Sequence, residues 1–164
     1  FLHFRQFCVW LSFFVLNGWW WPKFNRKIYA TNFGSCLLVK LLLAIAFGGA
    51  LGALGRYFVS TQLSHWLGSN IPWGTFTVNV IGSFILGALY EAGTLVWQPT
   101  AEVKAFLTIG MLGAFTTFSA FSLDVIVLIE RGAWVTAGGY AFGSVVMSVL
   151  GLVAGMMLMR GFVT

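Results

Sequence analysis

The sequence predicts an all-α membrane protein with four transmembrane helices. Hydrophobic residues make up 59% of the 164 residues, and charged residues make up only 8%. Soluble domains carry roughly 25% charged residues. So few charges could not cover a water-exposed surface, whereas a chain surrounded by hydrocarbon needs few. The arrangement of the apolar residues, in long runs separated by short polar connections, supports the same class.

The four apolar segments run over about 41–63, 74–97, 105–129 and 132–159. Each can cross a bilayer core of about 30 Å, which requires about 20 helical residues. Pro72 and Pro99 lie in two of the connections, where helix-breaking residues are expected. Tryptophans lie at the predicted helix ends, as in an aromatic belt at the membrane surface: Trp66, Trp73, Trp97 and Trp134.

Residues 1–38 differ from the rest of the chain in charge. Four of the nine basic residues lie in the first 27 positions, while from Lys40 onward basic and acidic residues nearly balance. We expect 1–38 to be a leader, translated from upstream sequence, with 39–164 forming the four-helix domain and Val39 as its start. A genuine additional segment is the alternative. Because the net charge of +5 belongs mainly to this leader, it predicts no nucleic-acid partner.

Small residues recur along the first and fourth predicted helices. Glycines line one face of each: Gly48, Gly52 and Gly55 on the first, and Gly139, Gly143, Gly151 and Gly155 on the fourth. Helices in lipid associate by close backbone contact, which small residues allow. The glycines therefore predict tight helix packing.

Two predicted helices carry polar stripes at a spacing of four residues, which places each stripe on one helix face. The stripes are Thr75, Asn79 and Ser83 on the second helix, and Tyr140, Ser144 and Ser148 on the fourth. Hydrogen bonds between helices, worth about 0.6 kcal/mol each, are one interpretation. A path for a small ion or polar molecule is the other, since these groups are neutral donors and acceptors.

The third predicted helix contains a weak point at mid-membrane depth. Glycines are followed there by the paired β-branched residues Thr116 and Thr117, which predicts a break. Broken backbone at this depth must be buried in protein or line a cavity, and its freed carbonyls can bind a cation such as sodium. Phe118 and Phe121 share a helix face, and their positively polarised ring edges can face an anion.

Three segments resemble, in order and spacing, the CrcB/Fluc family of fluoride channels. They are GGALGALGRY at 48–57, GTFTVNVIGSF at 74–84 and GMLGAFTTFSAF at 110–121, and the stripe from Tyr140 to Ser148 also fits. The resemblance covers about residues 40–162. Two positions depart from the family pattern, which has a hydroxyl residue at Ala120 and usually glutamate at Asp124.

The resemblance implies a passive fluoride-specific channel in the bacterial cytoplasmic (inner) membrane, built as a dual-topology homodimer of two antiparallel subunits with two pores. Its implied fluoride pathway comprises Asn79, Phe118, Phe121, Ser119, Tyr140, Ser144 and Ser148. Backbone carbonyls of Gly113 and Thr116 would hold a structural sodium ion at the dimer centre, which is not transported. Arg56 would lie near a vestibule.

The charges alone also predict dual topology, because orientation follows the imbalance of Lys and Arg across the membrane. One side would carry Lys40, Lys104 and Arg160, and the other Arg56 and Arg131. This small imbalance favours insertion in both orientations.

Two other classes fit the sequence less well. A small dual-topology multidrug exporter should carry a membrane-embedded carboxylate in its first helix, but residues 41–63 contain neither Asp nor Glu. A non-transporting assembly subunit would explain the glycines but not the aligned polar stripes. An enzyme is not expected, since no nucleophile has an adjacent base and no metal-ligand cluster or phosphate-binding loop is present in the sequence.

Overall fold

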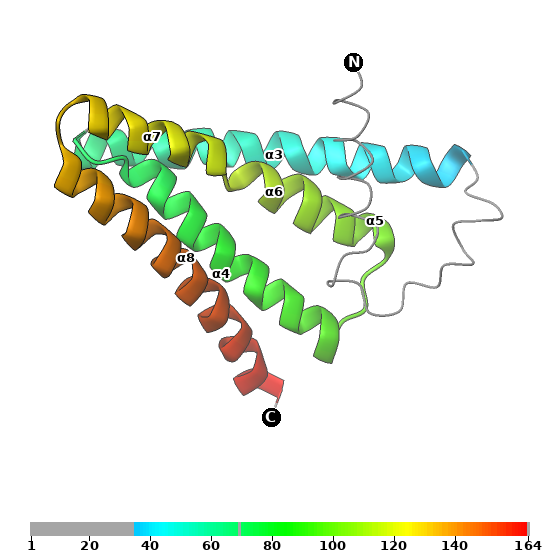
Figure 1. The fold of residues 1–164 in the computed structure, drawn as a ribbon. Helices are drawn as coiled ribbons and strands as arrows, with labels where there is room; N and C mark the ends of the chain where they lie inside the picture. The colour runs from blue at the N-terminus through cyan, green and yellow to red at the C-terminus, as the bar shows by residue number, and fades with distance from the viewer. Residues whose placement is uncertain (1–34, 69, 164) are drawn as a thin grey trace, which may run out of the picture. The chain divides into compact units, whose positions relative to one another are not determined.

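A computed structural model describes residues 35–68 and 70–163, and all regular structure within them is helical. Three helices are continuous, namely α3 (Ser35–Leu67), α4 (Trp73–Leu95) and α8 (Trp134–Val163). The third predicted helix is divided into α5 (Ala101–Lys104), the π-helix η1 (Ala105–Leu112), α6 (Gly113–Phe115) and α7 (Phe118–Glu130) (Figure 1).

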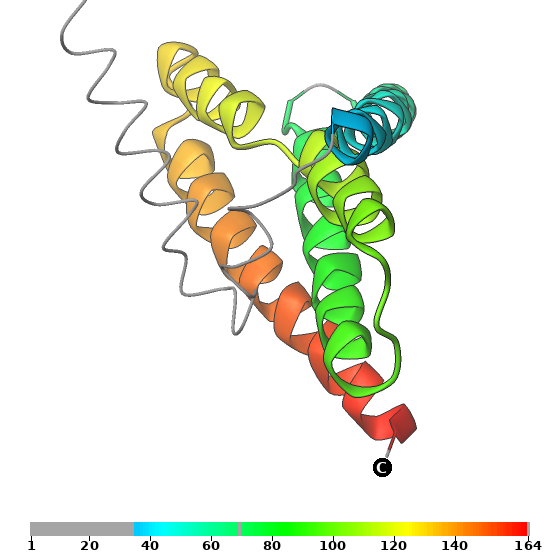
Figure 2. The ribbon, with the colours of Figure 1, turned by 90° about the vertical axis from the view of Figure 1, so that its right-hand side faces the viewer.

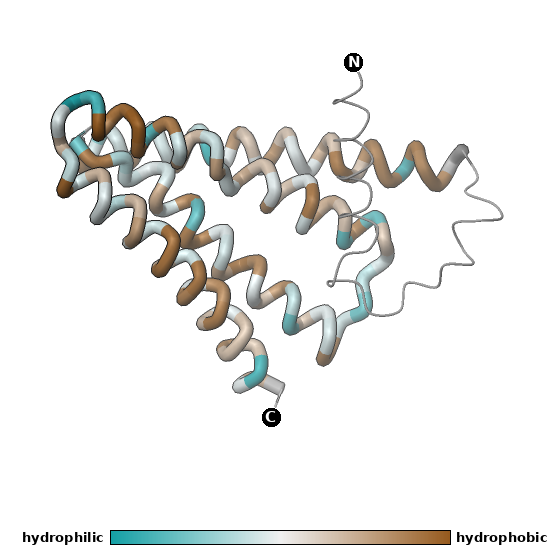
Figure 3. Tube along the Cα trace, viewed as in Figure 1, coloured by the Kyte–Doolittle hydropathy of each residue, from teal (hydrophilic) through white to brown (hydrophobic). Residues whose placement is uncertain are grey.

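Four spans are long and apolar enough to cross a membrane, which confirms the four-helix prediction. They are Leu37–Leu67, Trp73–Leu95, Ala101–Glu130 and Trp134–Phe162. Apolar residues recur along all four spans in Figure 3. Many large apolar side chains are exposed, among them Leu54, Phe142 and Val135. Exposed apolar area of this extent suits hydrocarbon and not water.

The first helix begins earlier than predicted. We expected a start near Leu41, but α3 begins at Ser35, because the intervening residues are apolar enough to continue the helix. The predicted leader therefore overlaps α3 at 35–38, and its remainder, including Cys8, lies outside the described residues. The leader hypothesis stays a prediction.

Helices that alternate in the sequence pack against each other through glycine. On α3, a Cβ added at Gly48 would overlap the carbonyl oxygen of Phe106, and one added at Gly52 would overlap that of Met111. Gly55 lies against the ring of Phe115. The predicted glycine face of the first helix thus packs on the broken third helix.

Helices α4 and α8 form the second such pair and lie side by side over much of their length (Figure 1). Figure 2 shows that the two helices converge toward their C-terminal ends. A Cβ added at Gly87 would overlap the carbonyl oxygen of Leu152, and one at Gly155 would overlap that of Phe84. At Gly87 and Gly155 backbone therefore touches backbone, which only glycine permits.

The fourth-helix glycine prediction holds for only one half of α8. Gly151 and Gly155 lie against α4, but an added Cβ at Gly139 or Gly143 would have no described atom of this chain within 4 Å. The main physical reason is helical phase. With about 100° between successive residues, Gly139 and Gly143 lie well around the helix from Gly151 and Gly155, whereas Ser144, seven residues before Gly151, shares the face of Gly151. Helix α8 also diverges from α4 toward its N-terminal end (Figure 2).

Candidate functional site

The third helix is interrupted at Thr116 and Thr117. Both residues have extended backbone, with φ and ψ of −81° and 156° at Thr116 and −154° and 121° at Thr117. β-Branched threonine favours extended backbone, and the hydroxyl of Thr117 caps the following helix by accepting from Ala120 N at 3.2 Å. The predicted break thus has a local cause in the sequence.

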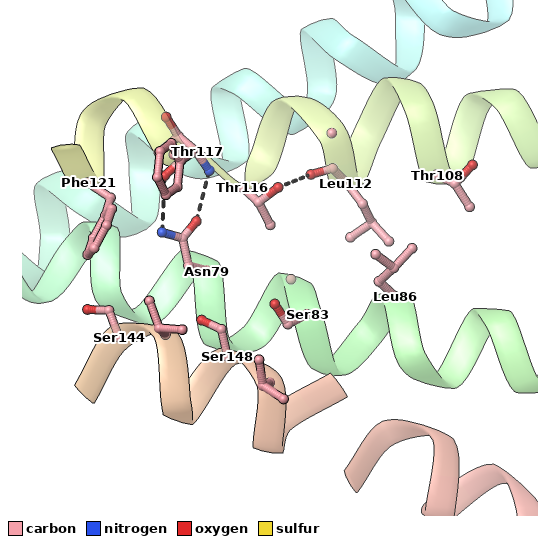
Figure 4. A pocket seen from close by; sticks show the side chains of 15 residues that line it. Asn79, Ser83, Leu86, Thr108, Leu112, Thr116, Thr117, Phe121, Ser144 and Ser148 are labelled. Carbon is pink, nitrogen blue, oxygen red and sulfur yellow. Dashed lines mark hydrogen bonds between the residues drawn. The ribbon is translucent and has the colours of Figure 1, made fainter. Parts of the chain in front are cut away.

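Asn79 on α4 clamps the interruption from across the structure. Its Nδ2 donates to the carbonyl oxygen of Thr117 at 3.1 Å, and Thr117 N donates to its Oδ1 at 2.8 Å (Figure 4). One amide side chain therefore satisfies both backbone groups of a buried residue in the gap between helices. Since the Asn79 amide has a second N–H, the clamp leaves one donor for another acceptor.

Because of these contacts, two backbone N–H groups no longer donate to the carbonyls that a continuous helix would pair them with. In a continuous helix Thr117 N would donate to Gly113 O, and Ala120 N would donate to Thr116 O. Thr117 N donates instead to Asn79, and Ala120 N to the Thr117 hydroxyl. The carbonyls of Gly113 and Thr116, the two in the predicted sodium site, are thus released from the helical pattern.

A pocket of about 430 Å³ lies between the interrupted helix and the polar faces of α4 and α8 (Figure 4). It combines hydroxyls, one amide and two aromatic rings with aliphatic side chains. Its lining residues are Asn79, Gly82, Ser83, Leu86, Thr108, Leu112, Gly113, Thr116, Thr117, Phe118, Phe121, Ser144, Val145, Ser148 and Val149. None of these side chains carries a formal charge.

Three of the hydroxyls around the pocket differ in their hydrogen bonding. Those of Thr108 and Thr116 donate to carbonyls one turn earlier in their own helix, at 2.7 and 2.9 Å from the acceptor oxygens. Ser144 is 3% exposed, and its Oγ has no hydrogen-bond partner among the described residues. A buried hydroxyl without a partner costs about 1–3 kcal/mol, so this position favours a bound solute or water that completes its hydrogen bonds.

The phenylalanines form a short aromatic row beside these groups. The ring centroids of Phe118 and Phe121 are 5.4 Å apart, and those of Phe121 and Tyr140 are 5.6 Å apart. The Tyr140 hydroxyl donates to Asp124 Oδ2 at 3.2 Å, which joins α7 to α8. Phe118 is 76% exposed in this single chain, so its ring can meet a solute or a second chain.

The structure brings together most, but not all, of the predicted site residues. Asn79, Phe118, Phe121, Ser144 and Ser148 line the pocket, as do Gly113 and Thr116. Ser119 is not among the lining residues, and its hydroxyl lies 3.2 Å from that of Thr117. Tyr140 lies behind Phe121 and does not line it either. Their place in a fluoride pathway stays a prediction.

Sequence reasoning missed two contributions to this pocket. Thr108 lines it from η1, but a lone threonine in an apolar helix gives no signal of its own. Thr117 provides the backbone N–H that donates to Asn79, and its hydroxyl caps α7. Its β-branched side chain, which favours extended backbone, was the only signal of this role in the sequence. Ser83 lines the pocket as its place in the polar stripe suggested, although the stripe alone did not assign it a role.

Comparison with known proteins gives a consistent family. Residues 43–156 match the model of the family described as CrcB-like protein, Camphor Resistance (CrcB). The chain is 54% identical over 122 residues, 74% of its length, to 97% of a protein of Rhodospirillum centenum named fluoride-specific ion channel FluC. Proteins of the same name from Chelativorans sp. and Nitrobacter winogradskyi are 48% and 44% identical. Each of these two matches covers 119 residues, 73% of this chain, and 95% and 94% of the relative respectively. With its four apolar spans, the chain is a multi-pass bacterial membrane protein.

Proposed function

The chain belongs to the CrcB-like family, and from this premise we propose that it is a fluoride-specific channel that lowers intracellular fluoride by passive export. The observation that carries the proposal is the uncharged pocket at the Asn79 clamp, which is lined by neutral hydrogen-bond donors and two aromatic rings. The channel would lie in the bacterial cytoplasmic membrane.

Fluoride is small and strongly hydrated, so it leaves water only where other donors replace its shell. The second N–H of Asn79 and the hydroxyls of Ser144 and Ser148 offer such donors along the pocket. Ring edges of Phe118 and Phe121 add weak positive potential. Because no fixed positive charge lines the pocket, each contact is weak enough for the ion to move on.

The functional unit of this proposal is an antiparallel homodimer. In one chain the N-terminal half of α8 exposes Gly139 and the apolar Phe142 and leaves Gly143 half-buried, and Gly113 is exposed at the break. A second copy in the opposite orientation would cover such a surface, and the near balance of basic residues across the membrane permits both orientations.

A structural sodium ion fits the donors at the break. The carbonyls of Gly113 and Thr116 have lost their helical partners to Asn79 and Thr117, and carbonyl oxygen is a ligand that sodium prefers. One chain supplies two such oxygens, and a twofold-related copy would double them. When bound, the ion would neutralise these carbonyl dipoles. Exchange of sodium for a large organic cation should then lower dimer stability, measured by size-exclusion chromatography.

The decisive test is ion efflux from liposomes that contain the purified protein. We expect rapid fluoride efflux, with chloride efflux no faster than in protein-free liposomes. An organic-cation load serves as the control for the multidrug-exporter alternative. Absence of fluoride efflux from liposomes with verified dimer content would overturn the proposed function.

A further inference from the structure

An ion pair outside the pocket joins the converging ends of α4 and α8. Arg160 Nε donates to Glu91 Oε1 at 2.8 Å, and its second terminal nitrogen donates to Oε2 at 3.2 Å. This two-point contact between a planar guanidinium and a carboxylate fixes orientation as well as distance. Neither residue touches the pocket.

The two partners differ sharply in burial. The Glu91 side chain is 7% exposed, whereas that of Arg160 is 59% exposed. An arginine in the last turn of a membrane helix can extend its charge toward water or lipid headgroups. Arg160 instead binds a buried carboxylate on another helix. A buried carboxylate is strongly destabilising without a partner, and Arg160 supplies that partner for Glu91.

The pair lies in line with the glycine contacts of the same helices. Gly87 touches the backbone at Leu152. A Cβ added at Gly151 would lie 3.1 Å from the carbonyl oxygen of Val80. Glycine surfaces are smooth and allow close approach, but they do not by themselves resist sliding of one helix along the other. A two-point ion pair at one end adds a directional contact that resists such sliding.

We propose that Glu91 and Arg160 are positioning residues that fix the register of α4 against α8. The register matters because α4 carries Asn79 and Ser83 to the pocket, and α8 carries Ser144 and Ser148. A shift of one helix would move the hydroxyls of α8 away from the Asn79 clamp. The transport consequence rests on the proposed fluoride function, whereas the register itself does not.

Register is measured first, by a disulfide. The two native cysteines are first removed as Cys8→Ser and Cys36→Ser. New thiols are then placed on the two helices by Val80→Cys and Gly151→Cys. These positions are close, since a Cβ added at residue 151 would lie 3.6 Å from Val80 Cγ1. We expect fast disulfide formation within one chain. Arg160→Gln should slow it on the order of tenfold, and Arg160→Lys should have an intermediate effect, because an ammonium lacks the planar fork. Arg131→Gln, which changes an exposed arginine outside the pair, is the control.

Fluoride efflux per assembled dimer is measured next, in chains with native Val80 and Gly151. We expect Arg160→Gln to be slowest and Arg160→Lys to be intermediate, as for the disulfide. Glu91→Gln should be less affected than Arg160→Gln, because the Arg160 side chain that loses its partner is 59% exposed and can be solvated. An ion pair that only stabilises the fold would leave the rate per dimer unchanged. Unchanged disulfide rates, or normal efflux in both Arg160 variants, would overturn the positioning role. If the wild-type protein does not conduct fluoride, the proposed function fails, and the disulfide rates still decide the register.

Discussion

In the second half of α8, Gly151 and Gly155 lie against the backbone of α4, whereas in its first half Gly139 and Gly143 have no described atom of this chain near an added Cβ. The first half instead presents Tyr140 and Ser144 to the α7 side and the pocket. The same helix thus holds the fold at one end and forms a polar surface at the other. Glycine content alone does not tell these uses apart, because what matters is which face of the helix each glycine lies on.

The largest effect should follow from a substitution in the second half of α8, where this helix packs on α4. Gly155→Leu would drive a large side chain into the carbonyl of Phe84, and overpacking of this kind costs about 1–3 kcal/mol or more. We expect loss of assembled protein, measured by size-exclusion chromatography after extraction. Gly161→Leu, on the same helix with nothing within 4 Å, is the matched control and should assemble normally. Equal yields of the two variants would contradict the packing described for α4 and α8.

The next effect concerns Asn79, which lines the pocket together with Ser144 from the first half of α8. Asn79→Asp keeps an acceptor for Thr117 N but loses the donor to Thr117 O and places a negative charge beside the pocket. We expect assembled protein with fluoride efflux lowered about a hundredfold, since like charges in a poorly solvated site repel strongly. Ser122→Ala is the control, because its hydroxyl donates only to Phe118 O and lies outside the pocket lining. Near-normal efflux in Asn79→Asp would remove Asn79 from the pathway.

A smaller effect is expected at the aromatic row. Phe121→Ile keeps an apolar side chain but removes the aromatic ring that packs against Phe118 and Tyr140, and with it the positively polarised ring edge. Fluoride efflux should fall about tenfold while the dimer remains assembled, because ring-edge contacts are individually weak. Phe118→Ile should behave in the same way. Full activity in both variants would show that the rings are packing residues only.

The smallest effect separates stability from transport. Ser144→Ala removes a buried hydroxyl that has no described partner, so the melting temperature should stay the same or rise. Fluoride efflux should nevertheless fall by a few-fold, on the order of one weak hydrogen bond. Ser122→Ala is again the control, since the Ser122 hydroxyl donates to Phe118 O and lies outside the pocket lining. A lower melting temperature with unchanged efflux would assign Ser144 to packing.

The four spans, the helix break and part of the pocket lining could be predicted from the sequence. The packing of Tyr140 could not. The four spans follow from apolar run length, and the interruption at Thr116 and Thr117 follows from β-branching next to small residues. The polar stripe on α4 correctly placed Asn79 and Ser83 on one lining face. Spacing could not show that Tyr140 packs against Phe121 outside the pocket lining, because that depends on how α7 and α8 pack together.

Contacts between residues far apart in the sequence were the hardest to predict. The double hydrogen bond between Asn79 and Thr117 joins residues 38 positions apart, and the Glu91–Arg160 pair joins residues 69 apart. Neither spacing corresponds to a helical repeat. The charge pattern identified Arg160 as one of several basic residues at helix ends and gave no sign of its buried partner.

The central claim is that fluoride passes through the pocket at the Asn79 clamp, and chemical block of that pocket tests it most directly. Ser148→Cys, in a chain with Cys8→Ser and Cys36→Ser, places a thiol in the lining, while Gly93→Cys places one on α4 outside it. Methyl methanethiosulfonate is added to liposomes during fluoride efflux. We predict that it stops efflux through Ser148→Cys and leaves Gly93→Cys unaffected. Continued efflux through fully modified Ser148→Cys would contradict the claim.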